Sequence, residues 1–204
     1  MTLDEMYQEC AMYIDETISK TGGLYTGDSL VIVNKLKTAI NYIYQKVAKE
    51  RYKLIYSESI TLDSNKQFSI SSLTNTFYEL VKIEDSNASQ VSWKFVPNEK
   101  IECPYKSSGD TLTIFYYYIP SELTNLTDEP IFPNGAINDK IYCFYASYFY
   151  LSQEIDSFSQ AKSGTYFNLF KDGYDTIKQN RGDLNMVVDV YTQPSYNSQS
   201  SFEG

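Results

Sequence analysis

Apolar residues recur at helical spacing near the N-terminus, which predicts two amphipathic helices. The first is expected to end at Gly22-Gly23, because glycine pairs interrupt helices. Its apolar positions are Leu3, Met6, Tyr7, Cys10, Ile14 and Ile18. In the second helix, Asp28 or Ser29 can provide the N-cap. Its apolar stripe advances in steps of three and four through Val33, Leu36, Ile40, Ile43 and Val47.

From Ser59 to Ile119 the apolar period changes to two, which is the period of a half-buried strand. The alternating positions are Ile60/Leu62, Phe68/Ile70, Val81/Ile83, Val91/Trp93/Phe95, Ile101/Cys103/Tyr105 and Leu112/Ile114/Tyr116/Tyr118. Turn-forming residues separate these groups, as at 63–65, 85–87 and 107–110. Short strands joined locally predict an antiparallel sheet or small barrel inserted between helices.

Three prolines, Pro120, Pro130 and Pro133, then predict an irregular connector. Two more helices are expected after it, at about 136–152 and about 160–180. The residues predicted to face inward are Ile137, Ile141, Phe144, Tyr148 and Leu151 in the first, and Tyr166, Phe167, Phe170, Tyr174 and Ile177 in the second. Gly182 fits the end of the last helix.

These elements predict an α+β protein. We expect a four-helix bundle with an antiparallel β module inserted between the second and third helices, followed by an extended C-terminal arm. The expected segments are an N-terminal helix pair at 1–56, the β module at 57–119, the proline turn with the C-terminal helix pair at 120–182, and the arm at 183–204. The two helix pairs would together form one domain.

Composition narrows the class of protein. The chain of 204 residues is 42% hydrophobic and 16% aromatic, which excludes a mainly disordered protein. Its 20 tyrosines suit partly hydrated protein interfaces as well as cores, because the side chain joins an apolar ring to a polar hydroxyl. An AT-rich genome, which favours tyrosine codons, explains their number equally well. The net charge of −9 argues against a protein that grips nucleic acid, but not against one through which DNA passes.

The three cysteines, Cys10, Cys103 and Cys143, are far apart and odd in number, which predicts buried free thiols in a reducing compartment. The acidic N-terminus has no signal segment, so we expect synthesis in the cytosol. The longest aromatic and aliphatic run, from Ile141 to Leu151, is too short to span a bilayer. We therefore expect no membrane contact.

The sequence shows no set of residues suited to catalysis. It contains no histidine, so the commonest general base is missing. The segment 22–29 has the glycine spacing of a phosphate-binding loop, but Asp28 stands where the loop needs a lysine. The pairs Asp128/Glu129 and Glu84/Asp85 are better interpreted as turn-shaping or solvated groups. We expect no catalytic residue, no cofactor and no metal ion, and hence no enzyme.

One basic feature stands out in this acidic chain. It is a possible channel-facing or partner-facing stripe formed by Lys35, Lys37, Lys46, Lys49, Arg51 and Lys53. Such a stripe can be an ordinary solvated helix face. The functional interpretation is electrostatic docking on an acidic neighbour, or a stripe that faces DNA and whose attraction falls with salt.

The segment after Gly182 has too little periodic apolar surface to fold alone. It contains no Lys or Arg and carries isolated apolar residues: Met186, Val187, Val188, Val190, Tyr191, Tyr196 and Phe202. A frayed C-terminus is one interpretation. The other is a binding arm that becomes ordered on a partner, most simply by adding a strand to a sheet edge.

The order of strand, proline turn and helix pair resembles the head–tail adaptor (connector) proteins of tailed bacteriophages. The resemblance rests on the Tyr-Tyr-Ile-Pro-Ser-Glu-Leu-Thr run at 117–124, the Asp-Glu-Pro-Ile-Phe-Pro turn at 128–133 and the helices around them. It implies a structural virion protein of the neck, made in the host cell cytoplasm. Members form rings of about twelve copies beneath the portal protein, extend the DNA channel and provide the platform for the next tail component. It also implies that the arm clasps the portal.

Ring assembly needs surfaces rich in aromatic residues. The rings of the helix at about 136–152 cannot all point into one core, so some face another element or another subunit. The possible subunit interface is formed by Tyr142, Tyr145, Phe149 and Tyr150. Two alternatives stay open: another neck or tail-completion protein, and a soluble β-rich binding module.

Overall fold

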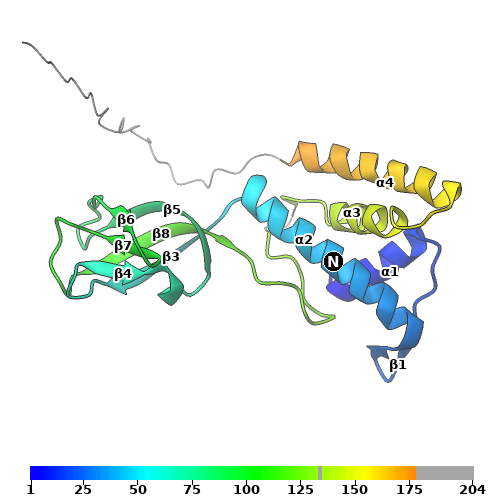
Figure 1. Cartoon of the computed structure of the whole chain (residues 1–204), viewed down its shortest axis with the longest axis horizontal. Coiled ribbons are helices and arrows are strands. Elements are labelled where there is room, and N and C mark those ends of the chain that lie inside the picture. The colour runs from blue at the N-terminus through cyan, green and yellow to red at the C-terminus, as the bar shows by residue number, and fades with distance from the viewer. Residues whose placement is uncertain (133–134, 178–204) are drawn as a thin grey trace, which may run out of the picture.

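The computed structural model of this chain describes residues 1–132 and 135–177. Figure 1 shows the helices at one end of the molecule and most of the strands at the other, joined by two chain segments. The helices are α1 (Leu3–Tyr13), α2 (Gly27–Glu50), α3 (Lys140–Leu151) and α4 (Ser157–Thr176), with a short 3₁₀ helix η1 (Ile70–Ser72). The predicted α+β class is confirmed by these helices together with three small antiparallel sheets in the described residues.

The strands form one hairpin and two three-stranded sheets within the described ranges. They are β1 (Lys20–Thr21), β2 (Leu24–Tyr25), β3 (Leu54–Thr61), β4 (Gln67–Ser69), β5 (Thr76–Glu84), β6 (Lys94–Val96), β7 (Lys100–Glu102) and β8 (Thr111–Ile119). The hairpin pairs β1 with β2, one larger sheet has the order β3-β8-β5, and the other has the order β4-β7-β6. All six alternating segments of the sequence thus contribute a strand to the two larger sheets.

The first helix ends earlier than its apolar spacing predicts. Thr2 caps it, since its hydroxyl accepts a hydrogen bond from the backbone N–H of Glu5, whose carboxylate accepts one from the N–H of Thr2. The helix stops at Tyr13, and Asp15 then adopts a positive φ of 58°, which an α-helix does not allow. The glycine pair that was expected to end the helix instead forms the turn of the β1–β2 hairpin.

The second helix is confirmed, with every residue of its predicted stripe buried. Its N-cap position is Thr26, so the predicted caps Asp28 and Ser29 lie inside the first turn. Ser29 has a different role, because its Oγ accepts a hydrogen bond from the backbone N–H of Ser19 at 3.0 Å. That bond ties the segment before the hairpin to the start of α2.

The helix α3 lies among the other helices and packs against α1, α2 and α4. It begins at Lys140, later than the predicted start near 136. Its buried side matches the predicted one at Ile141 and Leu151 only. The buried residues of α3 are Ile141, Tyr142, Cys143, Ala146, Ser147 and Leu151. Small residues on this side allow neighbouring helices to approach, while Phe144 and Tyr148 stay half-buried.

Two separate hydrophobic cores stabilise the chain. One gathers the buried residues of the four helices and the proline connector. The other lies within the β module and includes Ile83, Ile101, Ile114 and Tyr116. Tyr118, at the end of β8, packs against both cores. All three cysteines are buried and free, as predicted.

Candidate assembly surfaces

The proline connector, residues 120–132, is fixed to α2 by buried hydrogen bonds. The Asn41 amide donates to the carbonyl of Leu123 at 3.0 Å and accepts from its N–H at 2.7 Å. One turn further along α2, the hydroxyl of Tyr44 accepts a hydrogen bond from the N–H of Ile131 at 3.2 Å. No strand in the described sheets pairs with the connector, and these side chains satisfy backbone groups that a strand ladder would otherwise satisfy.

The connector also completes the N-terminus of α1. The N–H groups of Leu3 and Asp4 donate to the carbonyls of Asp128 and Leu126, at 2.8 and 3.0 Å. These donors have no partner inside the helix, so the connector satisfies them. The Asp128 carboxylate accepts hydrogen bonds from the N–H groups of Asn125 and Thr124, which lowers its pKa. Asp128 therefore shapes the turn, as predicted.

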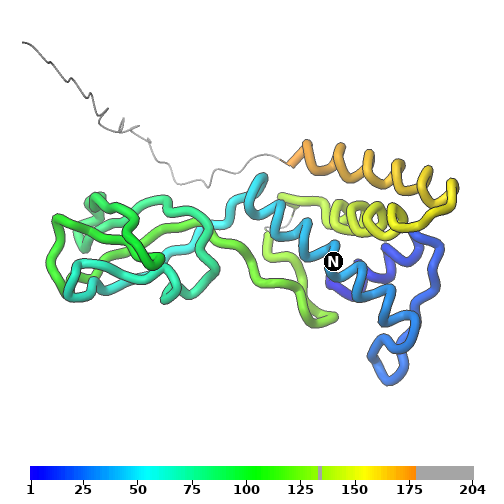
Figure 2. Tube along the Cα trace, in the orientation of Figure 1, coloured from blue at the N-terminus to red at the C-terminus, as the bar shows by residue number. Residues whose placement is uncertain are grey.

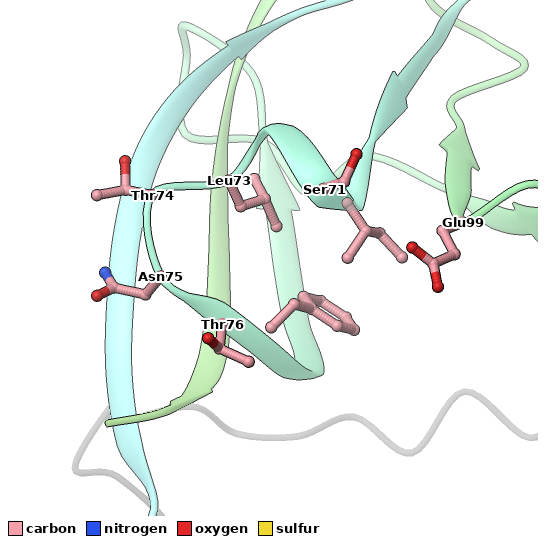
Figure 3. A pocket seen from close by; sticks show the side chains of 8 residues that line it. Ser71, Leu73, Thr74, Asn75, Thr76 and Glu99 are labelled. Carbon is pink, nitrogen blue, oxygen red and sulfur yellow. The ribbon is translucent and has the colours of Figure 1, made fainter. Parts of the chain in front are cut away.

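A cavity of about 510 Å³ opens at the rim of the β module. Figure 3 shows the side chains that line it, which are Ile70, Ser71, Leu73, Thr74, Asn75, Thr76, Phe77 and Glu99. Hydrogen bonds to Glu58 hold one wall, because its carboxylate accepts from the N–H of Thr74 at 3.0 Å and from the hydroxyl of Tyr116 at 2.6 Å. Glu99 is the single ionisable group among these lining residues, and the other side chains are hydroxyl, amide or apolar groups.

Charged partners within the subunit occupy much of the predicted basic stripe. Three of its six residues form ion pairs: Lys46 with Glu50 at 3.9 Å, Arg51 with Asp175 at 2.6 Å, and Lys53 with Glu79 at 2.5 Å. Arg51 and Lys53 also lie over tyrosine rings. The Lys46 pair lies within α2, whereas the contacts of Arg51 and Lys53 join the end of α2 to α4 and to the β module.

The remaining stripe residues lie on α2. The Lys35 ammonium lies over the ring of Tyr150, 5.2 Å from its centroid, and Lys37 donates to the carbonyl of Thr124 at 3.2 Å. In the described part of the chain, Lys49 makes no ion pair or hydrogen bond. The role of the stripe toward DNA or an acidic neighbour stays a prediction, and Lys49 is the position best placed to test it.

The aromatic residues of α3 are largely used inside the subunit. Tyr142 has no exposed surface and packs edge-on against Tyr44, so it presents nothing to a neighbouring copy in this structure. Tyr145 stacks on Tyr42 with ring centroids 5.6 Å apart. Phe149 and Tyr150 are half-buried. A contact between subunits through Tyr145, Phe149 and Tyr150 stays a prediction.

The predicted portal-binding arm, from Met186 to Phe202, lies outside the described residues. The sequence analysis did not single out several apolar side chains that the structure exposes. The best exposed of these on the helical part are Met12, Leu24, Leu30, Val31, Tyr42, Ile155, Phe158 and Leu169. Phe167, which was predicted to face inward, is also exposed. A signal for some of them exists, since residues 21–34 and 157–170 contain a single charged residue each, Asp28 and Lys162.

No metal-binding group of three or more His, Cys, Asp or Glu residues occurs in residues 1–132 and 135–177. Among the described helices, none is both long and apolar enough to cross a membrane.

Comparison with solved structures gives distant likenesses. No protein-family profile matches the chain, and no curated protein matches it. A chain in the solved structure titled "Neck of empty GTA particle computed with C6 symmetry" is similar, with 15% sequence identity and a TM-score of 0.24. The likeness covers 77% of this chain and 87% of that chain. Identity and TM-score this low identify neither a family nor a function.

Proposed function

We propose that this chain is a structural virion protein of the neck, a head–tail adaptor that forms a ring under the portal protein. In this role it extends the DNA channel, lets double-stranded DNA pass without sequence recognition, and provides the docking platform for the next tail or neck protein. The proposal includes the finer architecture expected from the sequence, a four-helix bundle that carries the β module.

The observation that carries the proposal is the position of the connector. The two motifs behind the resemblance, at 117–124 and 128–133, are separated by three residues only, and residues 120–132 are fixed on both α1 and α2. They link the last strand of the β module to the helices (Figure 2). A connector that is fixed to two helices in this way holds the β module in one orientation relative to the helices, as a subunit of a larger assembly requires.

The direct test is to mix the purified protein with the portal ring of the same virus and to image the complex. The proposal predicts a collar of about twelve copies on one end of the portal. No association, under salt conditions in which both proteins stay folded, would contradict it.

A second candidate, a β-rich binding module, is favoured by the cavity at the rim of the β module. That function predicts a monomer that binds a ligand saturably. The Glu99→Gln variant separates the two candidates, because the exchange should weaken ligand binding at the cavity and leave collar formation unchanged.

A further inference from the structure

The outer side of α4 exposes apolar side chains, and residues 157–170 contain a single charged residue. Phe158 and Leu169 lie about three turns apart on one side of this helix, and Ile155 lies just before it. Ile155 is 93% exposed and Phe158 is 69% exposed. We call Ile155, Phe158 and Leu169 the α4 face. Between positions 157 and 170 the one charged residue is Lys162, which is already paired with Asp15. Glu154 and Asp156 flank Ile155 at the edge of this face.

A second apolar surface lies on the β1–β2 hairpin and the start of α2. Leu24 projects from β2 and is 66% exposed, and Leu30 and Val31 are exposed in the first turns of α2. We call Leu24, Leu30 and Val31 the hairpin face. Asp28 is the only charged residue between positions 21 and 34. Protein interfaces are depleted of charge at their centre and polar at their rim. Residues 21–34 and 157–170 have the character of a centre in a chain whose residues are 21% charged, and Glu154 and Asp156 lie at the rim of the α4 face.

The two faces lie on opposite sides of the helical part. Figure 1 shows α4 along one side and the β1–β2 hairpin projecting from the other, with α1, α2 and α3 between them. A symmetric dimer would need one self-complementary patch, whereas a ring needs two different patches that lie apart on the same subunit. The arrangement of the two faces is of the second kind.

We infer that the α4 face of one copy docks on the hairpin face of the next copy, so that identical contacts repeat around a closed ring. This inference rests on the proposed function, because it names the contact that would build the proposed ring. It assigns the subunit contact to side chains that are exposed in the single chain. The exposed apolar side chains of the β module that lie far from both faces, such as Tyr105, take no part in it.

Thiol cross-linking of the full-length chain tests the contact. The double variant Leu24→Cys, Leu169→Cys is treated with a short bismaleimide, and covalent products are separated by size. The native cysteines are buried and should not react in the folded protein. We expect a ladder of dimers, trimers and larger products from the double variant. An equal mixture of the two single variants should give dimers only, and each single variant alone should give none.

Sedimentation of the same samples separates this inference from the proposed function. Oligomers that form without a ladder, or dimers from a single variant alone, would overturn the assigned contact and leave the ring intact. If the free chain is monomeric, the cross-linking is repeated on the portal ring. A collar there with a ladder supports the contact, and a collar without one overturns it. The absence of any collar would contradict the proposed function, and it would also overturn the assigned contact because that contact builds the ring.

A charge exchange gives an independent readout. Leu169→Glu should weaken self-association at least tenfold. Adding Leu24→Lys to the same chain places a lysine opposite each new glutamate of the neighbouring copy, and it should restore part of the association. Tyr105→Glu, at an exposed site on the β module, is the matched control and should have no effect. Association that survives Leu169→Glu unchanged would overturn the inference.

Discussion

Asn41 and Leu123 exchange two hydrogen bonds although 82 residues separate them in the sequence. One amide side chain thus satisfies both the N–H and the carbonyl of a connector residue. Both residues are buried, so water does not compete for these groups. The β module is inserted between them, and the pair therefore closes the base of the insertion on α2.

Replacing Asn41 by Ala should destabilise the protein by about 2–3 kcal/mol, because two buried backbone groups of Leu123 lose their partner. The measurement is the free energy of unfolding from urea titration. Asn34→Ala is the matched control, since Asn34 is exposed on the same helix and should change stability by less than about 0.5 kcal/mol. Equal effects of the two variants would show that the pair is not a fixed joint.

Gly173 marks a close approach between α3 and α4. A Cβ atom at this position would lie 2.8 Å from Cγ2 of Ile141, whereas one at Gly164 on the same helix would meet nothing within 4 Å. We expect Gly173→Ala to destabilise the protein by about 1–2 kcal/mol through overpacking. Gly164→Ala should stabilise it by about 0.5–1 kcal/mol, because alanine favours the helix.

A double-mutant cycle checks the cause of the Gly173 effect. Ile141→Ala removes the methyl group that the new Cβ would strike, so Gly173→Ala should no longer be destabilising in that background. The measurement is again the free energy of unfolding. A penalty that persists in the Ile141→Ala protein would place the cause elsewhere.

Much of the fold could be predicted from apolar spacing, and the misses have local causes. The stripe of α2 is long and regular, so its helix was found. Ile14 and Ile18 continue the spacing of α1 and are buried in its core, but Ile14 is the C-cap of the helix and Ile18 lies in a non-helical segment after the positive φ of Asp15. The spacing of apolar residues indicates which residues are buried, but it does not indicate where a helix ends and the backbone changes direction.

The candidate surfaces were harder to predict than the elements. Tyr142 was a reasonable interface residue from the sequence, because one helix cannot bury all the aromatic rings that this one carries. The structure pairs these rings with partners from other helices, such as Tyr44 and Tyr42. Which ring finds a partner inside the subunit depends on helix packing, and a single helical pattern does not contain that information.

The stability of the protein should depend on pH through Glu58, whose hydrogen bonds hold one wall of the cavity. Burial raises the pKa of this carboxyl, but hydrogen bonds from Tyr116 and Thr74 outweigh it and leave the pKa below its ordinary value of 4.5. A carboxyl with a lowered pKa stabilises the fold above its unfolded-state pKa, and the stabilisation is lost as pH falls through the folded-state pKa. We expect Glu58→Gln to be less stable than the wild type at pH 7.

The difference between these two proteins should shrink as the pH falls below about 4.5. Urea unfolding at several pH values measures it. Glu99→Gln, on another part of the cavity wall, is the control, because its carboxylate makes none of these hydrogen bonds. A difference that stays constant down to acid pH would show that the carboxylate of Glu58 is not the group responsible.

Lys49 offers the cleanest test of the basic stripe. Exchanging Lys46, Lys49 and Lys53 together would also break two ion pairs within the subunit. If the stripe faces DNA or an acidic neighbour, Lys49→Glu alone should lower the yield of DNA-filled particles while circular dichroism stays unchanged. Lys171→Glu, at an exposed site on α4, is the control. Normal yield from both variants would make the stripe an ordinary surface.

Deleting residues 183–204 tests the predicted arm. Both hydrophobic cores are built from residues up to Ile177, so the shortened protein should keep its melting temperature. We expect it to lose its association with the portal ring in a sedimentation assay, because an arm supplies extended backbone and apolar side chains to its partner. The full-length variant Val188→Asp, Tyr191→Asp keeps the length of the arm and removes two of its apolar side chains. It should lose association as well, whereas unchanged docking by the shortened protein would contradict the assignment of the arm.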